Sequence, residues 1–344
     1  MCDTQDAPIL MQERERMLDW MTAASPLLLM ALLYYRWQAA GLVLLAAAGY
    51  AAATTLLQWA GLARTTGTAA VSVGMWTAFL LPTAPLWVAG VAGVVAAAAA
   101  VLPAVSRRWI PRFPVGLPPA LVGYTAVWLM FPAYARAYTW PALWAPLSAQ
   151  PSVTVLAPLL APEAYPRLHL FFGMREGAIG EGCIPIVLMA AAYLLIRRRV
   201  RLIAPGAMLA TVALLSWMVW NAPLRGILVG STVLAALLLA DREYVPAAYG
   251  PQAVAGVVAG AVAVLLRALT GQDGCAVGVL AACLLSPLYP AFLRLCRRGA
   301  VWLWGVIRRY VPPVAAWIWA RITALWGRIG AFLREKFAKS ENKC

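Results

Sequence analysis

Long apolar segments with few charges are the feature that most constrains how this chain can fold. A helix needs roughly 17 to 25 apolar residues to cross a bilayer, where only helices and closed barrels satisfy the backbone. About ten such segments can be placed, several of them short or interrupted by Gly or Pro. They lie near residues 20–36, 39–60, 67–81, 84–103, 117–132, 183–196, 202–220, 223–240, 251–269 and 273–290. With 63% hydrophobic and 12% charged residues, the sequence predicts an all-α polytopic membrane protein.

Positive charges predict the orientation of this bundle, because Lys and Arg accumulate in cytoplasmic connections. The arginine-rich connections fall on one side and contain Arg14, Arg16, Arg64, Arg107, Arg108, Arg112, Arg197, Arg198, Arg199, Arg201 and Arg242. The N-terminal segment shows no small-residue cleavage site after a short apolar core, so no removable signal peptide is expected. We therefore predict a multi-pass protein of the inner or plasma membrane. Both termini, including residues 1–19, are expected in the cytoplasm, and the long connection 133–182 is expected outside.

The C-terminal segment, residues 291–344, is strongly basic, with eleven Lys and Arg residues against two Glu residues. Its tryptophans suit the headgroup region, and its apolar residues recur at helical spacing. We interpret it as an amphipathic helix on the cytoplasmic membrane surface, with lipid and not nucleic acid as its partner. A helix that docks on another protein is the alternative.

A weak internal repeat divides the predicted spans. Residues 77–105 and 234–266 each contain an apolar span, a Pro-containing turn and an Ala/Val/Gly-rich span, and one further span follows each. An odd number of spans per unit places two units in opposite orientations, as in many membrane folds built from duplicated units. We therefore expect two inverted five-helix halves, 20–132 and 183–290. The glycines and alanines are expected to permit close helix packing.

Residues for catalytic chemistry are scarce. The acidic residues outside the two termini lie near span ends or in connections: Asp19, Glu163, Glu176, Glu181, Asp241, Glu243 and Asp273. Buried carboxylates are therefore not expected, and an ion path would be shared with other subunits or lined by backbone. With His169 as the only histidine, neither a hydrolytic triad nor a metal site is predicted. The six cysteines contain no CxxC pair and are interpreted as packing residues, with a shared metal or redox role as the alternative.

Glycines lead directly into the sixth predicted span. Gly173, Gly177, Gly180 and Gly182 precede it, with Glu181 at its start. Such glycines allow backbone N–H groups to face an anion such as a phosphate, and a helix N-terminus favours negative charge. An ordinary tight turn with a favourably placed Glu181 is the alternative.

Four segments resemble one family of membrane proteins. The run GMREGAIGEG is similar to the G-x-x-x-G-x-I-G-E signature of the family that Rnf-type ion-translocating electron transport complexes (RnfD) share with sodium-translocating NADH:quinone reductases (NqrB). LPTAPLW (81–87), PPALVGYTAVWLMFP (118–132) and ADREYVP (240–246) resemble further segments of that family, in the same order. The resemblance covers most of residues 67–290. It implies a duplicated five-helix architecture similar to that of urea and ammonium channels.

The resemblance also implies a cofactor. In this family, a threonine in a motif like S-G-A-T-x-L-A carries FMN through a phosphoester bond that a separate flavin transferase makes. The matching stretch is PSVTVLA (151–157), so Thr154 would be the attachment residue, although hydroxyls there can also cap a short helix. A second, non-covalent flavin is a further implication. The residues that would shape the adjoining loop are Gly173, Gly177, Gly180 and Glu181.

The function implied by the resemblance is that of a membrane component of an ion-translocating electron transport complex. Such a component passes electrons through its flavin, couples their flow to Na+ or H+ translocation with other subunits, and is not catalytic alone. Asp241 is expected to close the cytoplasmic turn of the second half. The chain departs from the family pattern at Thr66, Pro118, Ser148 and Ser152-Val153. A cofactor-free channel or permease and a scaffold protein of the complex without flavin are therefore the alternatives.

Overall fold

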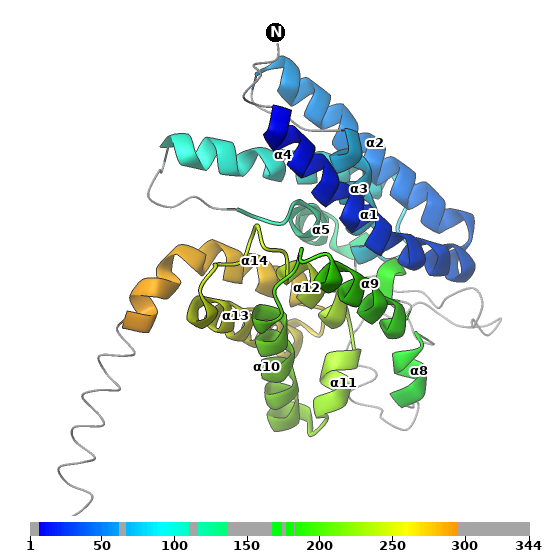
Figure 1. The fold of residues 1–344 in the computed structure, drawn as a ribbon. Coiled ribbons are helices and arrows are strands. Elements are labelled where there is room, and N and C mark those ends of the chain that lie inside the picture. The colour runs from blue at the N-terminus through cyan, green and yellow to red at the C-terminus, as the bar shows by residue number, and fades with distance from the viewer. Residues whose placement is uncertain are drawn as a thin grey trace, which may run out of the picture. The chain divides into compact units, whose positions relative to one another are not determined.

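The computed structural model describes residues 7–61, 67–109, 116–135, 167–173, 177–181 and 183–294. These residues form helices joined by turns, and the only extended pairing among them is an isolated bridge between Val200 and Asp241 (Figure 1). Met1–Tyr289 make up one compact unit. The predicted all-α fold is therefore confirmed for the part of the chain that is described.

The N-terminal half contains one helix for each of the first five predicted spans, and a short sixth helix. They are α1 (Ala7–Tyr35), α2 (Trp37–Trp59), α3 (Gly67–Leu80), α4 (Leu86–Trp109), α5 (Pro119–Met130) and α6 (Pro132–Ala135). The main difference from the prediction is the start of α1, which begins at Ala7 and not near residue 20. Because of this early start, Arg16 and Asp19 belong to a helix that packs within the bundle.

The C-terminal half begins after the long connection. Its elements are α8 (Arg167–Phe171), η1 (Ile179–Glu181), α9 (Ile184–Ile196), α10 (Ile203–Trp220), α11 (Pro223–Leu228), α12 (Thr232–Leu239), α13 (Tyr249–Thr270), α14 (Cys275–Leu285) and η2 (Ser286–Leu288). Helices α9, α10, α13 and α14 correspond to the sixth, seventh, ninth and tenth predicted spans.

Several of these helices are long enough to cross a membrane. Five stretches qualify by length and composition: Met11–Tyr35, Trp37–Trp59, Ile203–Trp220, Tyr249–Thr270 and Cys275–Arg294. The other apolar helices are shorter. With 14 residues, α3 is about 21 Å long, less than the roughly 30 Å of bilayer hydrocarbon. The protein is thus a multi-pass membrane protein in which full-length and shorter helices are combined, and the count of ten spans stays a prediction.

The eighth predicted span is the one that the structure corrects. A single helix was expected over 223–240, but α11 and α12 are separated by residues 229–231. Val229 is extended, and Gly230 has a φ of +65°, a conformation that favours glycine. The break interrupts helical hydrogen bonding inside the bundle, so the freed backbone groups need other partners.

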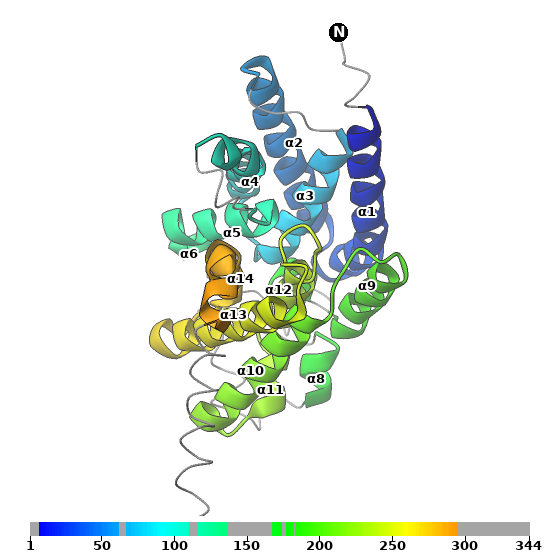
Figure 2. The ribbon, with the colours of Figure 1, turned by 60° about the vertical axis from the view of Figure 1, so that its left-hand side comes forward.

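Glycines bring helices into close contact in both halves, as expected from the small-residue composition. A Cβ atom at Gly123 of α5 would clash with the carbonyl oxygen of Ala92 in α4, and one at Gly278 of α14 would clash with that of Ala259 in α13. The order of packing also recurs, because α4 packs on α2 and α5 while α13 packs on α10 and α14. Figure 2 shows α5 and α14 side by side where the halves meet. The inverted orientation of the halves and the likeness to channels stay predictions.

Two predicted regions lie mostly outside the described residues. The connection 133–182 is described only at 133–135, 167–173 and 177–181, and the C-terminal segment only as far as residue 294. The amphipathic helix and the attachment residue Thr154 therefore stay predictions from the sequence.

Candidate functional site

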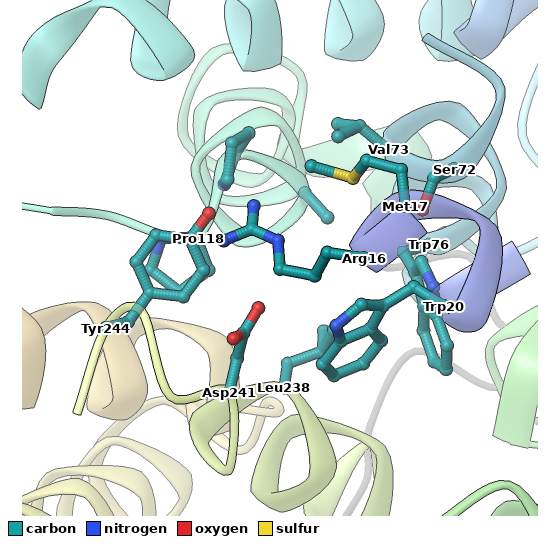
Figure 3. A pocket seen from close by; sticks show the side chains of 12 residues that line it. Arg16, Met17, Trp20, Ser72, Val73, Trp76, Pro118, Leu238, Asp241 and Tyr244 are labelled. Carbon is teal, nitrogen blue, oxygen red and sulfur yellow. The ribbon is translucent and has the colours of Figure 1, made fainter. Parts of the chain in front are cut away.

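A pocket lies among α1, α3, the start of α5 and the turn after α12, at the end of the bundle predicted to be cytoplasmic (Figure 3). Its walls are mainly apolar and carry a few polar groups, which is the composition of a small-molecule site. The lining residues are Arg16, Met17, Trp20, Ser72, Val73, Trp76, Pro118, Pro119, Ala120, Leu238, Asp241 and Tyr244.

Three donors on residues of this pocket have no hydrogen-bond partner among the described residues. They are the Nε of Arg16 and the indole Nε1 of Trp20 and of Trp76, and all three atoms are buried. The two indole rings pack edge to face, with their centroids 5.3 Å apart. A buried donor without a partner costs about 1–3 kcal/mol, so three in one pocket need an explanation. Acceptor atoms of a bound molecule would supply it.

Acidic and phenolic groups lie across the pocket from the indoles. Burial raises the pKa of the Asp241 carboxyl group to about 6, although the guanidinium groups of Arg16 and Arg199 oppose this shift. Burial also raises the pKa of the Tyr244 phenol, which keeps it protonated. Figure 3 shows Arg16 extended across the pocket with its guanidinium group near the Asp241 carboxylate. Asp241 can therefore hold or release a proton close to neutral pH.

Asp241 also closes the turn after α12, as predicted. Its Oδ1 accepts a hydrogen bond from the backbone N–H of Glu243 at 3.1 Å, and its backbone carbonyl accepts one from Tyr244 at 3.2 Å. The Glu243 carboxylate pairs with the guanidinium group of Arg16. The turn and α1 are thus joined beside the pocket.

A further ion-pair cluster fixes α1 next to this turn. The Asp19 carboxylate accepts hydrogen bonds from the Nε of Arg197 at 2.9 Å and the Nε of Arg199 at 2.6 Å. The backbone N–H of Arg201 donates to the carbonyl oxygen of Ala240 at 2.8 Å. The α9–α10 connection therefore links α1 to the turn that carries the pocket's acidic residue.

The glycines predicted to shape the flavin loop fall in two places. Gly173 follows α8 with a φ of +74°, and Gly177 is buried at the start of the stretch 177–181. Thr154 lies outside the described residues, so the structure does not relate it to either glycine. Their role in a flavin site stays a prediction.

Gly180 and Glu181 pack closely beside α3. A Cβ atom at Gly180 would clash with Phe79, so close packing by itself requires glycine at this position. Glu181 is buried, and its carboxylate accepts a hydrogen bond from the backbone N–H of Ala178 at 3.4 Å. This local bond matches the tight-turn interpretation of the glycine-rich segment.

A second polar cluster fills the break between α11 and α12. Arg267 of α13 is fully buried, and its guanidinium group donates to the carbonyl oxygens of Gly226 at 3.0 Å and Val229 at 3.2 Å. Its Nη2 lies 3.0 Å from the Thr232 hydroxyl oxygen and 3.1 Å from Oδ1 of Asp273. Arg267 and Asp273 thus form a buried ion pair that also binds carbonyl groups freed by the break.

Asp273 stays ionised in this cluster. Burial acts to raise the pKa of its carboxyl group, but the Arg267 charge and the hydrogen bonds from Ser231 hold that pKa below its ordinary value. One of these bonds comes from the backbone N–H of Ser231 at 2.6 Å, and the other from its hydroxyl group. The Asp273 carboxylate therefore balances the Arg267 charge inside the bundle.

The expectation that buried carboxylates are absent is wrong. Asp19, Glu181, Asp241 and Asp273 are only 2% to 7% exposed, because helix ends that carry them are covered by neighbouring helices. Sequence analysis missed Arg267, since one charge in the last turn of an apolar span usually reaches the headgroup region. The acids did lie near span ends as expected, but their burial depends on contacts between distant segments.

A bundle of apolar helices with one broken span, a buried ion pair in the break and a polar pocket at one end defines a polytopic helical membrane protein. The sequence model of the NQR2, RnfD, RnfE family matches residues 115–296, more than half of the chain, so the chain belongs to this family. Its members are membrane subunits of Rnf- and Nqr-type complexes. The match includes α5 and α8–α14, and α1–α4 precede it. Comparison with curated proteins finds no match.

Proposed function

We propose that this chain carries electrons within an Rnf-type complex, through FMN bound covalently to Thr154 and a second flavin bound non-covalently in the Trp20–Trp76 pocket. Electron flow would be coupled to Na+ or H+ translocation together with other subunits, and a flavin transferase would attach the FMN. Family membership supports the complex. The observation that carries the second flavin is the set of three unpaired donors in the pocket.

The residues of the pocket are complementary to the polar edge of an isoalloxazine ring. That edge presents two carbonyl oxygens on either side of an N–H group, and a bound flavin supplies one- and two-electron transfer. Arg16 and the indole N–H groups of Trp20 and Trp76 would donate to the acceptors of the ring. The Asp241 carboxylate would accept from its N–H. Apolar neighbours such as Leu238 would exclude water.

Asp241 gives the pocket a proton site. Because its pKa is about 6, the carboxyl group changes between protonated and ionised forms close to neutral pH. The nearby guanidinium group of Arg16 favours the ionised form. We infer that the Asp241 carboxylate holds the proton that accompanies electron transfer on this side of the membrane.

The covalent flavin is tested by ultraviolet fluorescence of the denatured protein in a gel. The chain is expressed with its flavin transferase, and Thr154→Ala is compared with the wild type. Ser152→Ala, which removes the neighbouring hydroxyl of the same motif, is the matched control. A fluorescent band that only Thr154→Ala abolishes is expected. A band retained in Thr154→Ala would remove this residue as the tether.

The non-covalent flavin is tested by releasing it on acid denaturation and measuring flavin per chain. Trp20→Phe combined with Trp76→Phe keeps two aromatic rings but removes two donors, so released flavin should fall several-fold. Trp217→Phe, on an exposed face of α10, should leave it unchanged. If neither bound nor released flavin is found in the wild type, the scaffold hypothesis replaces electron transfer.

A further inference from the structure

The Arg267 guanidinium group occupies a shell of acceptors in the break of the eighth span. Around its Nη2 lie the Val229 carbonyl oxygen at 3.2 Å, the Thr232 hydroxyl oxygen at 3.0 Å and Asp273 Oδ1 at 3.1 Å. The Cys275 sulfur lies 3.3 Å from the same nitrogen. Four acceptors therefore converge on one atom.

This arrangement differs from ordinary hydrogen bonding by a guanidinium group. Nη2 carries two N–H bonds, so four acceptors exceed the protons available to them. At the same time, the buried Nε of Arg267 has no partner among the described residues. A shell that crowds one nitrogen and leaves another donor unused is arranged around a positive charge.

The composition of the shell fits a monovalent cation. A backbone carbonyl, a hydroxyl and a carboxylate are hard oxygen ligands, which bind cations without directional preference. The Asp273 carboxylate supplies one negative charge, so a single positive charge leaves the site neutral. All of these groups are buried, with Asp273 2% exposed and Thr232 fully covered.

We propose that Arg267 is a tethered cation that occupies an alkali-cation site in the broken span and thereby closes this span to Na+ and K+. Ion movement by the complex would then use a route other than the break between α11 and α12. This inference goes beyond the proposed electron-transfer role and does not depend on bound flavin.

The experiment uses the full-length chain in detergent and compares its thermal midpoint in NaCl or KCl with that in choline chloride at equal ionic strength. In Arg267→Ala, the vacated shell should take up an alkali cation, so NaCl or KCl should raise the midpoint by about 3 °C or more over choline chloride. The wild type and Arg267→Lys keep a tethered charge and should show no such difference. Adding Asp273→Asn to Arg267→Ala should abolish the gain.

Three results would overturn the proposal. The first is recovery of Arg267→Ala by millimolar guanidinium but by neither alkali chloride, which would make Arg267 a structural cross-link only. The second is failure of Arg267→Ala to fold in any of these salts while Arg267→Lys folds. The third is a wild type stabilised by Na+ or K+ in a manner that Asp273→Asn removes, which would mean that a mobile ion binds beside Arg267.

Discussion

Two buried arginines of this protein each lie beside an aspartate, but the balance of donors and acceptors around them is opposite. Around Arg267, acceptors outnumber the protons that reach them, and Asp273 completes the charge balance. Around Arg16, donors lack acceptors, because its Nε and two neighbouring indole N–H groups have no partner among the described residues.

This difference separates a closed polar cluster from an open one. The Arg267 cluster has the carbonyls freed at Gly226 and Val229 engaged, so it stabilises a broken helix. The pocket at Arg16 carries unsatisfied donors, which a native protein tolerates where a ligand completes them. An arginine–aspartate pair thus indicates structure or binding according to which hydrogen-bond partners remain.

The largest expected effect is the loss of stability in Arg267→Met. Removing this guanidinium group leaves a buried Asp273 carboxylate without its counter-charge, which destabilises by about 3–5 kcal/mol. The matched change Arg16→Met should cost about 1 kcal/mol or less, because its partner Glu243 has a side chain that is 42% exposed. Unfolding of both variants followed by tryptophan fluorescence in choline chloride measures the difference. Equal losses of stability would break the contrast between the clusters.

Asp241→Asn should change how stability depends on pH. The pKa of Asp241 is raised from 3.8 to about 6, so the folded state favours its protonated form. The stability that this provides is complete below pH 3.8 and is lost as pH rises through about 6. The asparagine variant lacks this loss and should exceed the wild type by up to about 3 kcal/mol above pH 6.

Unfolding measured across this pH range in the two proteins tests the expectation. Glu243→Gln is the control, because it changes a half-exposed carboxylate of the same turn. Parallel curves for the wild type and Asp241→Asn would mean that Asp241 is not held in a protonated form by its burial.

Sequence patterns predicted the helices better than the contacts between them. Apolar length located α2, α3, α10 and α13 within a few residues, because hydrophobicity acts over each segment independently. The break at Gly230 was hidden by apolar residues on both sides of a short Gly-Ser-Thr sequence.

Buried charge was harder to predict for a physical reason. Arg267 is stabilised by groups 35 to 41 residues away in α11 and α12, and by Asp273 in the next turn. Similarly, Trp20 meets Trp76 from a different helix. No local pattern reports such pairs, so the pocket required the structure, whereas the family resemblance was readable from GMREGAIGEG and is confirmed by the family match.

Thr232→Val should give a moderate effect. The Thr232 hydroxyl donates to the Val229 carbonyl at 2.7 Å and accepts from Arg267 at 3.0 Å, and valine retains its shape but makes neither bond. A loss of about 1 kcal/mol is expected. The control is Thr77→Val, where the buried hydroxyl bonds a carbonyl within its own helix at 2.7 Å. If the two variants lose equal stability, the hydroxyl of Thr232 has no special role in the break.

The smallest expected effect on stability is that of Trp76→Phe. Phenylalanine keeps an aromatic ring beside Trp20 and Phe79, while it removes a buried donor that has no partner among the described residues. Losing an unsatisfied donor offsets part of the lost packing, so the free energy of unfolding should change by less than about 1 kcal/mol. Flavin retention should nevertheless fall, because the same N–H group is assigned to the ligand. A variant that stays stable and loses flavin would place Trp76 in binding, whereas one that loses stability and keeps its flavin would make the pocket a structural feature like the Arg267 cluster.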